Sequence, residues 1–163
     1  MSSAKRALFL DWGGTLALTK HNRTVVDPAG HPVLMPNVVA TLARERPRFD
    51  ACFIVSNQAR VSTGEISEAE VLRRFAWANE QLGGPFTDCR LCPHTDADGC
   101  KCRKPRPGMF LELARAHGVD LGASTHVGDS EKDRDAATAA GVGRFVWARD
   151  FFGWTTDPAD SRA

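Results

Sequence analysis

Apolar residues along this chain gather in short runs that alternate with helical patterns. Four runs predict strands: ALFL at 7–10, ACFIV at 51–55, THVG at 125–128 and RFVWA at 144–148. Nearly continuous apolar runs are typical of parallel strands that are covered on both faces. Because helical segments separate these runs, the order predicts a doubly wound α/β fold with a mainly parallel, Rossmann-like sheet.

Helical patterns fill the first two gaps between these runs. In VVATLARE, at 38–45, the apolar side of the helix is made by Val38, Val39 and Leu42. A second helix is predicted from Ser67, which forms a capping-box pattern with Glu70, to the paired glycines after residue 82.

Two further helices follow in the second half of the chain. One has Pro107 near its first turn and ends at Gly118. Its apolar residues are Met109, Leu111 and Leu113. The other follows Asp129 and ends at Gly141.

The length of the chain predicts a single domain over residues 1–163. Two segments stand apart from the alternating pattern. Residues 18–36, rich in Pro, Gly and His, predict a hairpin flap, and residues 89–104 predict a cysteine-rich loop. The last residues of the chain, from about 155, have the composition of a frayed end.

Charge and hydropathy narrow the choice of partners. The chain has 21 basic and 20 acidic residues, so bulk electrostatics does not favour a nucleic acid or an anionic membrane. No apolar run approaches the roughly 20 residues of a membrane span, and the first residues lack the apolar core of a signal peptide. We therefore expect a cytoplasmic protein that handles a small molecule by local chemistry, in an oligomeric state that the sequence leaves open.

Polar residues that suit phosphate chemistry follow the predicted strands. They are Asp11 with Thr15, Ser56 with Asn57, Lys104 in CRKPRPG, and Asp129 with Asp133 in GDSEKD. Alone, each is more simply explained as a turn residue, a helix cap or a solvated charge. Together they meet at one edge of a parallel sheet, where a carboxylate can attack phosphorus while a lysine and a metal ion neutralise the phosphoryl oxygens.

Each residue in this set predicts one role. Asp11 is the expected nucleophile, and Asp129 and Asp133 hold Mg²⁺ beside it. Ser56 and the backbone around Asn57 offer hydrogen bonds to phosphate, and Lys104 offers a compact positive charge.

The sequence resembles the haloacid-dehalogenase-like (HAD) phosphatase superfamily, whose four motifs match DWGGT, VSNQ, Lys104 and VGDSEKD. The likeness is greatest to the branch of histidinol-phosphate and heptose bisphosphate phosphatases, which reads TNQ where this chain has SNQ. That branch also carries a loop like CPHTDADGCKCRKPRPG. The resemblance implies a HAD core without a cap domain, with Asp11 as nucleophile. It further implies that Asp129 and the Gly13 carbonyl bind Mg²⁺, and that Ser56 and Lys104 hold phosphate, with Thr15 part of the same motif.

The cysteine-rich loop predicts a second metal site. Three thiolates and one imidazole suit a closed, structural Zn²⁺ site that would fix Arg103 and Lys104 near the phosphate. These ligands are Cys92, His94, Cys100 and Cys102, and the resemblance points to the same set. Alternatively, Cys89 and Cys92 form a CxxC pair that completes a four-cysteine site or exchanges disulfides. The short loop looks more like that of the histidinol-phosphate phosphatases.

Gly13 departs from the family pattern, because phosphatases of this superfamily usually carry a second Asp there as general acid and base. Losing such a group typically costs about 10²- to 10⁴-fold in rate. Three interpretations stay open. The chain is a hydrolase that recruits another group, such as His21, Asp27 or the substrate itself; it acts on acyl phosphates or phosphonates; or it is a phosphate- or partner-binding module.

We expect a Mg²⁺-dependent phosphohydrolase of a small phosphorylated metabolite, with weak or altered turnover. The guanidinium groups of Arg103 and Arg106 suit a second anionic group on the substrate; alternatively, both are solvated loop arginines, and for Arg106 this interpretation is at least as good. Without a cap, the flap, the cysteine-rich loop or a neighbouring subunit must enclose that substrate.

Overall fold

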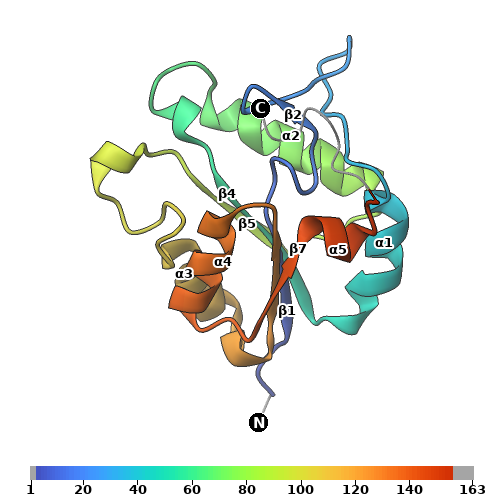
Figure 1. Cartoon of the computed structure of the whole chain (residues 1–163), viewed down its shortest axis with the longest axis vertical. Coiled ribbons are helices and arrows are strands. Elements are labelled where there is room, and N and C mark those ends of the chain that lie inside the picture. The colour runs from blue at the N-terminus through green and yellow to red at the C-terminus, as the bar shows by residue number, and fades with distance from the viewer. Residues whose placement is uncertain (1–2, 156–163) are drawn as a thin grey trace.

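A computed structural model describes residues 3–155, which are built around a five-stranded parallel sheet (Figure 1). The strand order is β5-β4-β1-β6-β7, and all neighbouring strands are parallel. The strands are β1 (Ala7–Leu10), β4 (Ala51–Asn57), β5 (Asp88–Cys92), β6 (Thr125–Gly128) and β7 (Arg144–Trp147). The central strand β1 is completely buried, as its apolar sequence predicts.

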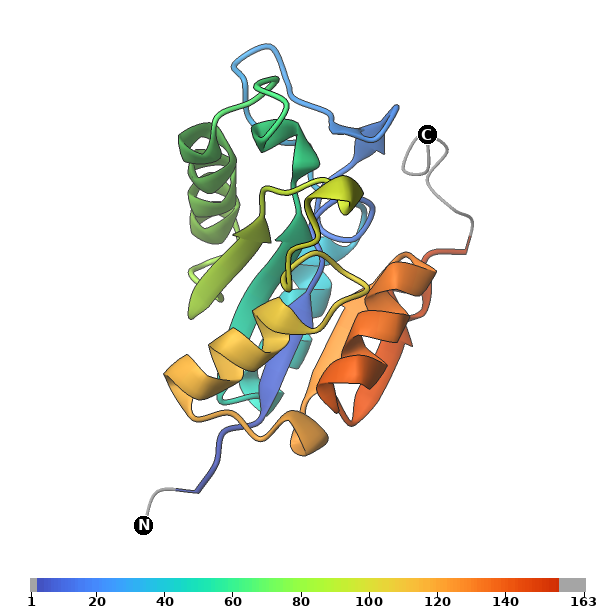
Figure 2. The ribbon, with the colours of Figure 1, turned by 90° about the vertical axis from the view of Figure 1, so that its left-hand side faces the viewer.

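Helices cover both faces of this sheet (Figure 2). One core cluster joins β1 residues Leu8 and Leu10 to α1 (Val38–Glu45), α2 (Glu68–Gln81) and α5 (Ala148–Phe152). The other joins Phe9 to α3 (Gly108–His117) and α4 (Glu131–Ala140). Because side chains alternate along a strand, β1 anchors both layers, and the predicted doubly wound fold is confirmed.

Short 3₁₀ turns join several of these elements: Arg46–Arg48, Ala59–Val61, Asp96–Asp98 and Leu121–Ala123. No cap domain interrupts the described part of the chain. No helix within residues 3–155 is long and apolar enough to cross a membrane. The assignment of the whole chain to one domain stays a prediction.

The structure extends and corrects the predicted strands. β4 runs two residues further than expected, and Ala148 begins α5 instead of ending the last strand. The sequence analysis missed β5 and α5. The polar residues Asp88 and Arg90 interrupt the apolar pattern of β5, and an edge strand needs little apolar sequence because only Cys92 is fully buried.

The helices lie where they were predicted, but some residues that were predicted to be buried on them are exposed. Val39 is 56% exposed, and Thr41 takes its place beside Val38 and Leu42. In α3, Leu111 is 42% exposed, and Phe110 packs in the core instead. These positions agree with a helix whose buried residues recur three and four positions apart.

The predicted capping box at the start of α2 is only half formed. The Ser67 hydroxyl accepts a hydrogen bond from the Glu70 amide. The Glu70 carboxylate pairs with Arg73 and Arg74 instead of returning to the cap.

The flap is a hairpin that packs against the core. Its strands β2 (Thr19–Lys20) and β3 (Arg23–Thr24) are antiparallel, and the two residues between them have positive φ. The Trp12 indole donates a hydrogen bond to the Thr24 hydroxyl (3.0 Å), and His31 stacks on Trp77 of α2 with ring centroids 4.8 Å apart. These contacts hold the flap over the carboxyl edge of the sheet.

Candidate active site

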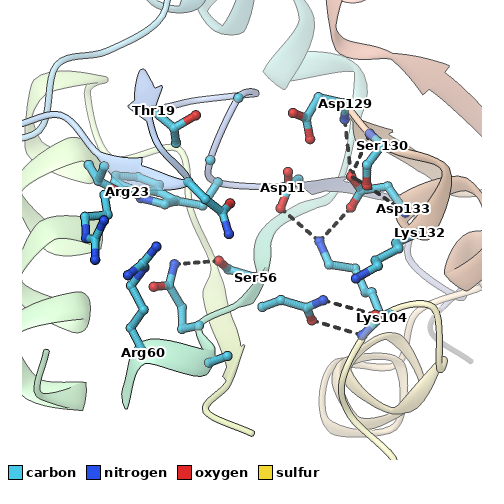
Figure 3. Close-up of a pocket in the computed structure, with 18 of the residues that line it drawn as sticks. Asp11, Thr19, Arg23, Ser56, Arg60, Lys104, Asp129, Ser130, Lys132 and Asp133 are labelled. Carbon is cyan, nitrogen blue, oxygen red and sulfur yellow. Dashed lines mark hydrogen bonds and ion pairs between the residues drawn. The ribbon is translucent and has the colours of Figure 1, made fainter. Parts of the chain in front are cut away.

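A cavity of about 1330 Å³ opens at the carboxyl edge of the sheet (Figure 3). Its wall combines residues that follow β1, β4 and β6 with residues of the flap and of the cysteine-rich loop. Residues from the predicted set that line it are Asp11, Gly13, Ser56, Asn57, Arg103, Lys104, Asp129 and Asp133. The structure therefore brings together side chains that are far apart in sequence.

Lys104 lies at the floor of the cavity and is 2% exposed. Its ammonium donates hydrogen bonds to Asp11 Oδ1 (2.9 Å), Asp133 Oδ1 (2.6 Å) and the Val55 carbonyl (2.9 Å). Asn57 fixes the backbone of Lys104 with two hydrogen bonds, one accepted from the amide (2.9 Å) and one donated to the carbonyl (3.0 Å). The cation is thus held by the residue that follows β1 and by groups of β4 and α4.

Asp133 closes the turn that leads from β6 into α4. Its Oδ2 accepts hydrogen bonds from the amides of Asp129 and Ser130 (both 3.2 Å) and from the Ser130 hydroxyl (3.0 Å). A Cβ on Gly128 would lie 2.4 Å from the Asp133 side chain, so only glycine allows this close approach.

His126 is a member of the site that the sequence analysis did not assign. Its ring is fully buried, with Nδ1 3.0 Å from the Phe9 carbonyl and Nε2 3.3 Å from Asp133 Oδ1. A lone histidine in an apolar strand carries no pattern that points to a partner seven residues away.

Three carboxylates crowd the floor of the cavity, because one oxygen each from Asp11, Asp129 and Asp133 lies within 4.8 Å of the others. Burial and the charge of Asp133 raise the pKa of Asp11. Burial and the charge of Asp11 raise the pKa of Asp129 to about 9. Although burial acts against it, the charge of Lys104 holds the pKa of Asp133 below its usual range.

The acid cluster fits a hard divalent cation. Three carboxylates lie near the positive charge of Lys104, and burial together with the neighbouring negative charge raises the pKa values of Asp11 and Asp129. Carboxylate oxygens are the ligands that Mg²⁺ prefers, and its charge would favour the ionised form of both acids.

The remaining residues that were predicted to bind phosphate or a second anionic group do not all line the cavity. Thr15 is fully buried, and its hydroxyl lies 3.4 Å from Asp11 Oδ2 rather than in the cavity wall. Ser56 lines the cavity, and its hydroxyl accepts a hydrogen bond from Nε2 of the Gln58 side chain (2.8 Å). Arg103 also lines it, held by Asp96 (2.8 Å), whereas the Arg106 guanidinium turns to the Cys100 carbonyl.

His21 and Asp27 of the flap were the candidates to replace the acid missing at residue 13. In the described structure, neither of them lines this cavity. The Asp27 carboxylate accepts hydrogen bonds from the amides of Ala29 and His31 and so closes a turn within the flap. His21 lies at the tip of the hairpin with positive φ. Neither residue therefore lies in the cavity wall with Asp11.

The cysteine-rich loop gathers Cys92, His94, Cys100 and Cys102 into one cluster. Their neighbouring ligand atoms are 2.8 to 3.6 Å apart. A tetrahedral zinc ion places such atoms about 3.5 to 3.8 Å apart, close to three of these four separations. The donor set therefore fits a closed zinc site.

Cys89 lies outside that cluster. It is on β5 opposite Ile54, and burial raises the pKa of its thiol. Cys52 is also buried, which raises the pKa of its thiol to about 12. The geometry favours His94, and not Cys89, as the fourth ligand.

The chain is similar to known phosphatases in sequence and in fold. The family model described as polynucleotide kinase 3 phosphatase matches residues 6–144. D-glycero-beta-D-manno-heptose-1,7-bisphosphate 7-phosphatase of Rhodopseudomonas palustris is 35% identical, over 85% of this chain and 81% of that protein. The protein of the same name from Vibrio cholerae is 32% identical, over 90% of this chain and 82% of its own length.

A solved structure is also similar. The D,D-heptose 1,7-bisphosphate phosphatase of Bordetella bronchiseptica, complexed with magnesium and phosphate, has a TM-score of 0.76 and 28% identity. The match covers 96% of this chain and 90% of that one. These relatives carry the heptose bisphosphate name, and the likeness of the short cysteine-rich loop to that of the histidinol-phosphate phosphatases stays a prediction.

The raised pKa of Asp129 predicts that stability depends on pH. Without Mg²⁺, folded Asp129 keeps a proton that the unfolded chain loses, so the free energy of unfolding should fall as the pH rises from about 4 to about 9. Urea denaturation at about pH 6 and about pH 8.5 measures this fall. The Asp129→Asn variant should exceed the wild type at the higher pH by more than about 1 kcal/mol. Equal slopes for both proteins would contradict the assignment.

The cysteine cluster predicts a zinc content of one ion per chain. Cys100→Ser should lose the metal and lower the free energy of unfolding by about 3 kcal/mol or more, because metal binding stabilises the folded loop. Cys89→Ser is the matched control, and it should keep its zinc. Elemental analysis and thermal unfolding measure both effects; loss of zinc from the Cys89 variant instead would support the four-cysteine alternative.

Proposed function

The chain belongs to the HAD-like phosphatases, in the branch of the heptose bisphosphate phosphatases, and on that premise we propose that it is a Mg²⁺-dependent phosphohydrolase of a small phosphorylated sugar. The observation that carries the proposal is the buried ammonium of Lys104 between Asp11 and Asp133, at the floor of an open cavity. Such an ammonium offers its charge where a phosphoryl group would meet Asp11.

In the first step, an Asp11 oxygen attacks phosphorus. A bond forms between that oxygen and phosphorus, and the bond to the leaving oxygen breaks, so that the electron pair departs with the sugar. Water then attacks the phosphorus of the aspartyl phosphate, restores the Asp11 carboxylate and releases inorganic phosphate. The second step returns Asp11 to the state in which it began.

Neighbouring residues bind and orient the phosphoryl group. Lys104 and the Ser56 hydroxyl line the cavity beside Asp11 and contact the phosphoryl oxygens. Asn57 acts by holding the Lys104 backbone, and Thr15 acts by orienting the Asp11 carboxylate. Their contribution is positioning, which is most of what phosphoryl transfer requires of a protein.

Asp11, Asp129 and the Gly13 carbonyl would hold Mg²⁺, with Asp133 completing the acid cluster. When bound, this ion neutralises charge on the phosphoryl group. In the cysteine-rich loop, Cys92, His94, Cys100 and Cys102 would hold a structural Zn²⁺. That site would fix the loop from which Arg103 and Lys104 enter the cavity.

The cavity supports a substrate larger than phosphate alone. Arg103 in its wall suits a second anionic group, since guanidinium binds phosphate or carboxylate through two parallel hydrogen bonds. Relatives of this chain are named for a heptose bisphosphate. A phosphorylated sugar about as large as a heptose bisphosphate is therefore the substrate class that we propose.

We expect Asp11→Asn to lower kcat by about 10³-fold or more, because the variant loses the nucleophile. Release of phosphate from a panel of sugar mono- and bisphosphates with Mg²⁺ measures this loss. Asp27→Asn is the matched control, since it removes a carboxylate of the flap that does not line the cavity. Equal rates for wild type and Asp11→Asn would contradict the proposal, and Mg²⁺-dependent binding without turnover would indicate a binding module.

A further inference from the structure

Two arginines line the cavity on its flap side. Arg23 belongs to β3 of the flap, and Arg60 belongs to the 3₁₀ turn that follows β4. Both line the same cavity as Lys104. Figure 3 shows them on one side of this cavity, with Asp129 and Asp133 on the other. At about 1330 Å³ the cavity is larger than most ligand pockets, so one substrate can span both the ammonium at its floor and this second basic region.

The two guanidinium groups share one carboxylate. Arg23 donates a hydrogen bond to Glu65 Oε1 (2.6 Å), and Arg60 donates one to Glu65 Oε2. Glu65 also lines the cavity. Hydrogen bonds from Arg23 and from Arg60 hold the pKa of Glu65 below its ordinary value, so its carboxylate is ionised at neutral pH. An oxyanion of this chain thus occupies the space between the two arginines.

Glu65 balances only part of the charge of this pair. Two guanidinium groups carry two positive charges, and one carboxylate carries one negative charge. Among the described residues, Arg23 donates to Glu65 alone, although a guanidinium has five N–H donors. Glu70, five residues further along the chain, also pairs with two arginines, Arg73 and Arg74. In the described structure, this side of the cavity therefore keeps an excess of positive charge and of hydrogen-bond donors.

The contact joins the flap to the loop that follows β4. Arg60 also donates a hydrogen bond to the His21 carbonyl at the tip of the flap (3.3 Å), and the Glu65 amide donates one to the Arg60 carbonyl (3.0 Å). The side chains of Arg23 and Glu65 are 55% and 40% exposed, and ion pairs as exposed as this contribute little to stability. A ligand with a higher charge can therefore displace the Glu65 carboxylate at little cost.

We propose that Arg23 and Arg60 bind the second phosphate of a sugar bisphosphate, in the place that the Glu65 carboxylate occupies in this structure. The inference rests on the proposed phosphohydrolase function, in which Asp11 and Lys104 engage the phosphate that is cleaved. A phosphate dianion carries twice the charge of a carboxylate, and guanidinium groups bind it through paired hydrogen bonds. Glu65 and the second phosphate thus compete for the same two arginines, and Glu65 limits how strongly the chain prefers bisphosphates.

Arg103 also lines the cavity, but its contacts differ from those of this pair. Its guanidinium donates hydrogen bonds to the Asp96 carboxylate (2.8 Å) and to the His94 carbonyl (3.3 Å). Both partners belong to the same cysteine-rich loop as Arg103, so these contacts hold that loop together. Arg23 and Arg60 instead come from separate segments and meet at a carboxylate that lines the cavity. This difference favours the pair as the site of the second phosphate.

The first test measures substrate preference, which is kcat/KM for fructose 1,6-bisphosphate divided by kcat/KM for fructose 6-phosphate. Arg23→Gln and Arg60→Gln should each lower this preference about tenfold, because each removes a charge-assisted hydrogen bond to the second phosphate. Lys20→Gln is the matched control, since it removes an exposed cation of the flap that does not line the cavity, and it should leave the preference unchanged. An equal loss in Lys20→Gln, or a loss only in Arg103→Gln, would overturn the proposal.

Glu65→Gln gives a sharper test, because competition predicts a change of the opposite sign. The variant keeps the shape of the side chain but removes the negative charge that competes with the second phosphate. We expect it to raise the preference for fructose 1,6-bisphosphate about twofold to fivefold. If these residues served only to hold the flap in place, Glu65→Gln and Arg60→Gln would change the preference in the same direction. A preference that falls or stays equal in Glu65→Gln would contradict the competition.

Binding of a phosphonate, whose carbon–phosphorus bonds persist, separates this inference from the proposed function. Hexane-1,6-diphosphonate and hexylphosphonate differ in the second anionic group, and calorimetry with Mg²⁺ measures their affinities. We expect Arg60→Gln to weaken binding of the diphosphonate about tenfold and Glu65→Gln to strengthen it. If the wild type and Asp11→Asn release phosphate equally, the proposed function fails, and these affinities still decide the role of the arginines. Equal affinity of wild type and Arg60→Gln for the diphosphonate, or no binding by the wild type, would overturn the inference.

Discussion

The structure of the site depends on how one buried ammonium is accommodated. Lys104 is almost fully enclosed, and a buried charge is tolerated only when opposite charges and hydrogen bonds surround it. Asp11, Asp133 and the Val55 carbonyl meet that need, so the cation draws together β1, β4 and α4. The negative charge that remains on the acid cluster after this pairing is what suits the site to a divalent cation.

Close packing around the acids sets their geometry. Gly128 lets the Asp133 carboxylate approach the end of β6, and the His126 ring contacts the same carboxylate. Asn57 fixes the backbone of Lys104. The cysteine cluster lies further from the acids, and it organises the loop from which Arg103 and Lys104 project. Fold and chemistry are therefore linked, and a disturbance of the packing would reach the acid cluster directly.

The sequence predicted the parts of this arrangement that follow from chain order. Asp11, Ser56 and Asp129 end or follow apolar strands, and parallel strands bring such ends to one edge. It missed β5, since an edge strand with Asp88 and Arg90 lacks an apolar pattern. It also missed His126, whose ring contacts the Phe9 carbonyl across the fold, and contacts between distant segments leave no periodic signal.

The most direct measurement is the identification of a covalent intermediate on Asp11. Wild-type protein is mixed with Mg²⁺ and a sugar phosphate, quenched in acid and reduced with borohydride, and its peptides are analysed by mass spectrometry. The account predicts that phosphorylation, read as conversion of aspartate to homoserine, occurs on Asp11 and is absent from Asp11→Asn. Turnover without an adduct at Asp11, or with an adduct at another residue, would contradict it.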